Sequence, residues 1–163
     1  MERKNVLIAV DSSENSKRAV SYVGEMLGGS PGVRICLLYV EKPPNRDRFA
    51  TGEAWRQAAQ AKEQRLRSFL GEARTLLREL GIPDDGITEE YVVSCSSPLH
   101  ESTDYCTPGT SIAQEILRVQ EKGGYGTIVI GRRGVSRTEE FLFGSVSSKV
   151  VNHARNCTVW VVS

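Results

Sequence analysis

The chain has 163 residues, of which 39% are hydrophobic and 25% are charged, a balance typical of a folded globular protein. Its formal net charge of +1 excludes the basic excess of proteins that bind nucleic acid or anionic membranes through overall charge. The apolar run Val6–Val10 is too short for a secretory signal or a membrane span, so we expect a cytoplasmic protein.

Strand-like and helix-like segments alternate along the chain. The predicted strands are, in chain order, Val6–Val10, Val33–Val40, Thr88–Ser94, Thr127–Ile130 and Thr158–Val162. Apolar residues at helical spacing predict four intervening helices within residues 19–27, 53–80, 112–119 and 146–154. This alternation predicts an α/β fold, a doubly wound and mostly parallel sheet with helices on both faces. No linker divides the chain, so we expect a single domain, residues 1–163.

A glycine pattern follows the fourth predicted strand. Gly131 and Gly134 are spaced G-x-x-G, and nine residues later Gly144 and Ser145 open the last helix. Glycines let the backbone approach a ligand closely, and the free N–H groups of a helix start attract anions. The pattern predicts a phosphate-binding loop; the alternative is a tight connection that needs glycine only for its shape.

A second polar segment, Asp11 and Ser12, follows the first strand. Ligands of open α/β sheets bind beyond the carboxyl ends of the strands, where the strand order reverses. If the first and fourth strands are neighbours, Asp11 faces the glycine loop across that crevice. Asp11 also suits the start of a helix, and the two roles are compatible.

The usual nucleotide-binding signatures and the nucleophile elbow of hydrolases are absent from the sequence. There is no G-x-x-x-x-G-K-[ST], no G-x-G-x-x-G after the first strand and no G-x-S-x-G. We therefore assign no catalytic residue and no metal ligand.

The segment Ser94–Gly109 reads as an irregular loop that contains Cys95, His100 and Cys106. These three residues could form a redox or metal cluster, but we expect an incidental loop, because regular metal-ligand spacing is missing. The two cysteines could approach each other. In a cytosolic protein we expect no stable bridge between them.

The glycine pattern resembles the G-2x-G-9x-G-[ST] motif of the universal stress protein family. The similarity extends from Gly144 through Ala154 into Cys157–Val162, and the first strand with Asp11 and Ser12 resembles the family's beginning. The resemblance implies a five-stranded parallel sheet in the order 3-2-1-4-5. It also implies a homodimer paired through the last strand, Thr158–Val162.

The resemblance further implies nucleotide binding. The expected ligand is ATP, with or without Mg²⁺, and AMP and ADP are alternatives. The implied binding residues span the adenosine and phosphate ends of the ligand: Asp11, Ser12, Val40, Gly131, Arg132, Arg133, Gly134, Gly144, Ser145 and Val146. Arg132 occupies a position that is often small in the family.

We expect a regulatory, stress-response module that holds a nucleotide, meets an unidentified protein partner and catalyses little or nothing. One alternative is a slow ATPase or adenylate-handling enzyme, for which Arg132 and Arg133 could clamp phosphates but no base is assigned. Another alternative is a family member that binds no nucleotide and acts through protein contact.

Overall fold

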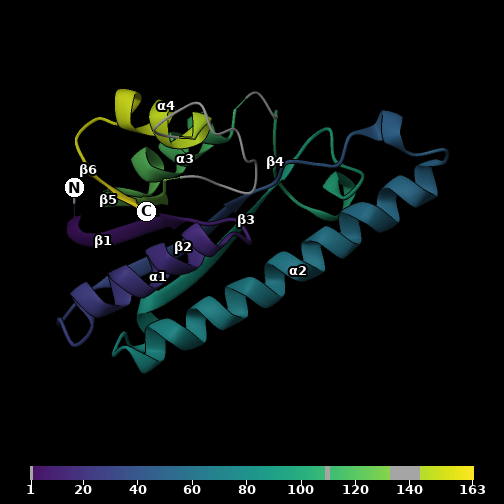
Figure 1. The fold of residues 1–163 in the computed structure, drawn as a ribbon. Helices are drawn as coiled ribbons and strands as arrows, with labels where there is room; N and C mark the ends of the chain where they lie inside the picture. The colour runs from purple at the N-terminus through teal and green to yellow at the C-terminus, as the bar shows by residue number, and fades with distance from the viewer. Residues whose placement is uncertain (1, 109–110, 133–143) are drawn as a thin grey trace.

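The computed structural model describes residues 2–108, 111–132 and 144–163 (Figure 1). In this part of the chain six strands form one sheet in the order β4-β3-β2-β1-β5-β6, and each neighbouring pair is parallel. The strands are β1 (Glu2–Ala9), β2 (Arg34–Val40), β3 (Ile87–Ser94), β4 (Cys106–Thr107), β5 (Tyr125–Gly131) and β6 (Thr158–Val162). The α-helices are α1 (Glu14–Leu27), α2 (Gly52–Glu79), α3 (Ile112–Gly123) and α4 (Ser145–His153). The predicted doubly wound α/β architecture is confirmed.

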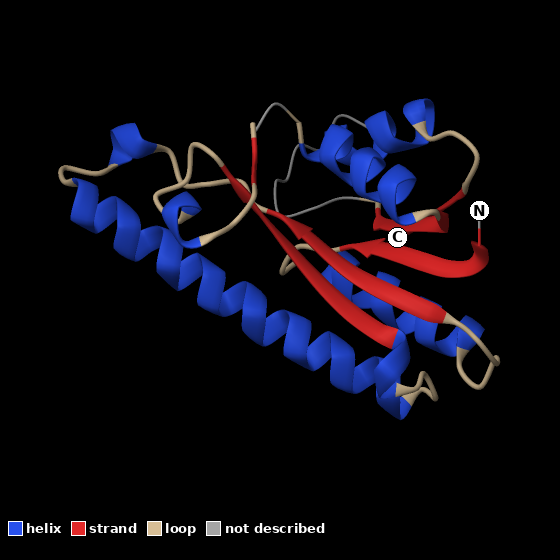
Figure 2. Ribbon diagram, turned by 180° about the vertical axis from the view of Figure 1, so that it is seen from behind, coloured by secondary structure: helices blue, strands red, loops and turns tan. Residues whose placement is uncertain are grey.

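Each face of the sheet carries its own hydrophobic core. On one face, inward residues such as Ile8 pack with α1 and α2, around Val20 and Leu70. On the other face, Leu7 packs with α3 and α4, around Ile116 and Val150. Figure 2 shows the strands lying between these two helical layers. Because both faces are covered, six successive residues of β2 are buried, which explains why the strands read as continuous apolar runs.

Local signals in the sequence fix three of the helix ends. The Ser13 side chain accepts a hydrogen bond from the Ser16 amide and begins α1, and Thr51 does the same for α2 through the Ala54 amide. Helix α3 ends at Gly124, whose φ of 65° lies in the left-handed region that glycine adopts without strain.

The predicted count of five strands is wrong, because the structure contains a sixth, β4. This strand lies within the segment expected to be irregular, and it pairs with β3 through Val93–Cys106 and Ser94–Thr107. The five predicted strands keep their predicted neighbours, and β4 adds to the outside of β3. A two-residue strand has no periodicity, so the sequence pattern could not indicate it.

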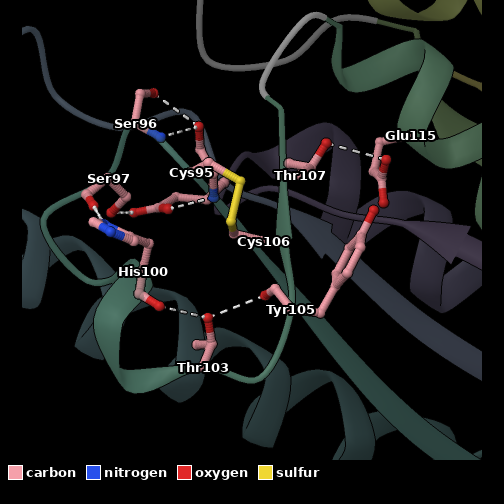
Figure 3. The surroundings of a disulfide bond; sticks show 11 residues. Cys95, Ser96, Ser97, His100, Thr103, Tyr105, Cys106, Thr107 and Glu115 are labelled. Carbon is pink, nitrogen blue, oxygen red and sulfur yellow. Dashed lines mark hydrogen bonds between the residues drawn. A yellow bond between two sulfur atoms is a disulfide. The ribbon is translucent and has the colours of Figure 1, made fainter.

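The expectation that Cys95 and Cys106 stay unbridged is also wrong. The two residues form a disulfide, with their Cα atoms 4.9 Å apart (Figure 3). The pairing of β3 with β4 brings them together, and the Cys95 amide donates a hydrogen bond to the Thr107 carbonyl at 2.8 Å. This separation lies within the range that a disulfide can span.

Candidate functional site

A cavity of about 740 Å³ opens at the carboxyl ends of β1, β2 and β5. Strands β1 and β5 are neighbours, and the strand order reverses between them, since β2 lies on one side of β1 and β5 on the other. Such a switch point is where open α/β sheets hold their ligands. The cavity has the size of pockets that enclose small organic molecules.

Asp11 organises the β1 side of the cavity. Its Oδ1 atom accepts hydrogen bonds from the Ser13 amide at 2.9 Å and from the Ser16 hydroxyl at 2.8 Å. The Ser16 hydroxyl in turn accepts a bond from the Asp11 amide at 2.8 Å. Asp11 therefore supports the loop that leads into α1, while Ser13 is the residue that caps the helix.

The β5 side of the cavity is held together by backbone bonds around Arg132. The Arg132 amide donates to the Val162 carbonyl at 2.7 Å, which ties it to β6. The Arg132 carbonyl accepts from the Gly144 amide and from the Ser147 hydroxyl, each at 2.9 Å. The Gly144 amide is thus already used inside the protein, and the first-turn amides of α4, which lack an intrahelical acceptor, begin at Ser145.

The two predicted glycines that the structure describes differ in what they do. Gly131 lies against the first turn of α1: a Cβ at this position would lie 2.9 Å from the Asn15 Cβ and 3.1 Å from its carbonyl carbon. Glycine is therefore needed here for packing. At Gly144, φ is −65°, which any residue adopts, so its backbone angle does not require glycine.

Eight of the ten predicted site residues line the cavity: Asp11, Ser12, Val40, Gly131, Arg132, Gly144, Ser145 and Val146. The other two, Arg133 and Gly134, lie outside the described residues. The structure thus brings the β1 and β5 loops to one crevice, and a binding role for these residues stays a prediction.

Sequence reasoning missed three basic residues of the cavity wall. Lys42 follows β2, Lys62 comes from α2, and Lys149 comes from α4. Burial lowers the pKa of Lys62, whose ammonium group donates a hydrogen bond to the Lys42 carbonyl. Among the described residues that line the cavity, four are basic (these lysines and Arg132) and one is acidic, Asp11, so this part of the wall favours an anion.

The fold and this crevice define a doubly wound α/β domain with a basic cavity at its topological switch point. A family model described as Universal stress protein family matches residues 2–163. The chain belongs to the universal stress protein family.

The chain is 24% identical to Universal stress protein Sll1388 from Synechocystis sp., with 96% of each chain covered. A universal stress protein from Archaeoglobus fulgidus, solved in complex with dAMP, superposes with a TM-score of 0.62 at 19% identity and covers 100% of both chains. A universal stress protein solved in complex with cAMP gives a TM-score of 0.62 at 20% identity, covering 97% of this chain and 94% of the other. At these identities the structural likeness establishes the fold.

None of the helices within residues 2–108, 111–132 and 144–163 combines the length and the apolar character needed to cross a membrane.

Proposed function

We propose that this protein is an adenine-nucleotide-binding regulatory module of the stress response, with ATP as its ligand and AMP or ADP as alternatives. One observation carries the proposal: a cavity of about 740 Å³ at the switch point, whose described wall residues include four basic side chains and one acid. Such a wall is suited to an anionic ligand. The related structures bound to dAMP and cAMP support an adenine nucleotide as the class of ligand.

In this proposal the nucleoside end of the ligand lies at β1 and β2, near Asp11, Ser12 and Val40. The phosphates lie at residues 131–134 and at the start of α4, around Ser145 and Val146. Two features of the wall support this direction. The α4 N-terminus carries no side-chain cap, so its first amides are suited to an anion, and Lys149 adds a positive charge one turn further along.

The wall favours binding over turnover. Efficient phosphoryl transfer needs a residue that positions or deprotonates the attacking group. Asp11 is the one carboxylate among the described lining residues, and its Oδ1 already accepts two hydrogen bonds. In this proposal a Mg²⁺ ion, where one accompanies ATP, is held by the phosphates, and no residue of the wall is assigned to it.

The proposal includes assembly and location. The last strand in the sheet order, β6, carries Val159, Trp160 and Val161, which are only half-buried. An apolar edge strand of this kind is suited to pairing with a second copy. We propose a cytoplasmic homodimer that presents its nucleotide-bound surface to a protein partner. Sedimentation velocity tests the assembly, and a monomer at every concentration would exclude it.

Isothermal titration calorimetry with ATP, ADP and AMP tests the function. We expect saturable binding, and we expect Lys149→Gln to weaken it by about ten- to hundredfold, because a hydrogen bond to a charged group contributes roughly 1.5–3 kcal/mol. The matched control is Lys122→Gln on the exposed end of α3, which should bind like the original protein. Absence of saturable binding at millimolar nucleotide would refute the proposal.

A second pair of variants tests the nucleoside end. Asp11→Asn keeps an oxygen that can accept from the Ser13 amide but removes the charge. It should weaken nucleotide binding while the fold persists. Asp85→Asn, at the opposite end of the sheet, should leave nucleotide binding unchanged. If both variants bind the nucleotide with equal affinity, Asp11 does not contribute to the binding site.

A further inference from the structure

A second, smaller cavity of about 280 Å³ adjoins the first. The two share wall residues at the end of β2 and the starts of α3 and α4: Val40, Lys42, Ile112, Ser145, Val146 and Lys149. The outer wall of the smaller cavity includes Ser94, Ser96 and Thr107. These residues are the immediate neighbours of Cys95 and Cys106 in the sequence, so the disulfide lies at the rim of this cavity. Figure 3 shows Ser96 and Thr107 beside the disulfide.

Among the described residues the disulfide is the one covalent bond across this rim, where β4 is otherwise held by its short pairing with β3 and by the Thr107–Glu115 hydrogen bond. Strand β4 has two residues, paired with Val93 and Ser94, and one further bond runs from the Cys95 amide to the Thr107 carbonyl. Two or three hydrogen bonds on a sheet edge contribute little net stability, since each competes with water. The S–S bond therefore adds a covalent tie to a strand whose backbone pairing is short.

Glu41 connects the rim to the larger cavity on the β2 side. This carboxylate lies between Val40 and Lys42 in the sequence and is only 4% exposed. It accepts hydrogen bonds from the Ser94 amide at 3.0 Å and from the Ser97 hydroxyl at 2.8 Å. A displacement of the segment around Ser94 would therefore act on the backbone of Val40 and Lys42, which line the larger cavity.

A parallel connection runs through α3. The Thr107 hydroxyl donates to the buried Glu115 carboxylate at 3.2 Å. Arg118 holds the same carboxylate and lies over the Tyr105 ring, 4.9 Å from its centroid. Ile112 and Ile116, on the same helix, line the larger cavity. The segment between Ser94 and Thr107 is thus bonded to both walls of the proposed nucleotide site.

We propose that the Cys95–Cys106 pair is a reversible redox site that sets the affinity of the neighbouring cavity for a nucleotide. The inference rests on the proposed function. A dithiol breaks the S–S bond by supplying two electrons; Cys95 and Cys106 each take a proton and become thiols, and the dithiol becomes a disulfide. Cys95 is exposed and Cys106 is half-buried, so a small dithiol can reach the bond, while the free Cys36 is buried.

The oxidised form is the tighter binder. The bond holds β4, and through Glu41 and Glu115 it keeps both walls in one arrangement before the ligand arrives. Once the bond is reduced, only a fraction of the molecules keeps that arrangement, and the apparent affinity falls by the same fraction. We expect reduction to weaken nucleotide binding by about three- to tenfold.

The test compares ATP binding to the purified protein before and after treatment with dithiothreitol. Thiol titration of the denatured protein should show two more thiols after reduction. The double variant Cys95→Ser/Cys106→Ser should bind ATP as weakly as the reduced protein does. Its affinity should not change when dithiothreitol is added. Cys157→Ser, which leaves the pair intact, should keep the full response.

Hydrogen exchange without nucleotide gives a second readout. Reduction should speed amide exchange in residues 94–107 and also in residues 40–42. Equal ATP affinity in both redox forms, or faster exchange confined to residues 94–107, would refute the proposed redox control of nucleotide affinity. The disulfide would then stabilise only its own segment. Absence of ATP binding in both forms would instead refute the proposed function, while the exchange data would still report on the coupling.

Discussion

Removing the Glu41 carboxylate should destabilise the protein strongly, because the group is a buried acceptor for two buried donors. Ser94 and Ser97 are each 1% exposed, so neither the Ser94 amide nor the Ser97 hydroxyl can turn to bulk water in place of Glu41. A buried donor without an acceptor costs about 1–3 kcal/mol. We therefore expect Glu41→Ala to lower the free energy of unfolding by about 3–4 kcal/mol, after some relief by local rearrangement.

Glu41→Gln separates hydrogen bonding from charge. The Gln carbonyl can accept from the Ser94 amide and its NH₂ can donate to the Ser97 hydroxyl, so both contacts survive as neutral bonds. We expect a loss of about 1–2 kcal/mol, since neutral hydrogen bonds are weaker than those to a carboxylate. Glu72→Ala, on the exposed face of α2, is the control and should change stability by less than about 0.5 kcal/mol.

Urea unfolding followed by circular dichroism measures these differences. For a chain of this size, 3–4 kcal/mol corresponds to a fall in Tm of roughly 6–16 °C. If Glu41→Ala loses less than about 1 kcal/mol, the buried bonds to Ser94 and Ser97 do not hold the segment in solution. The route from the disulfide to Val40 would then lose its support.

Two further predictions concern packing and pH. Gly131→Ala should lower the free energy of unfolding in urea by about 1–3 kcal/mol, because the new Cβ would lie 2.9 Å from the Asn15 Cβ. An unchanged free energy of unfolding would show that α1 can move aside. Gly71→Ala, in α2 with nothing within 4 Å of the new Cβ, is the counterpart and should stabilise by about 0.5–1 kcal/mol. Burial raises the pKa of Tyr39 from 10.0 to about 12, so the unfolded chain loses this proton first and stability should fall as pH rises through that interval. Tyr39→Phe should lessen the fall in urea titrations on either side of pH 10, and an unchanged pH profile would contradict the assignment.

The sequence determined the repeating elements because their signals are local. Period and composition predicted four helices and five strands, and the glycine pattern with Asp11 directed attention to the crevice that the structure contains. These signals depend on neighbours a few residues apart, which is the range over which helical and strand periodicity acts.

The tertiary structure decided what depends on contacts between distant residues. Strand β4 and the disulfide exist because β3 pairs with residues 106–107, a register that no local pattern encodes. Lys62 reaches the cavity because α2 packs across the sheet face, and the need for glycine at residue 131 comes from the approach of α1. Periodicity specifies which face of an element is apolar, but only packing determines which charges then meet at the carboxyl end of the sheet.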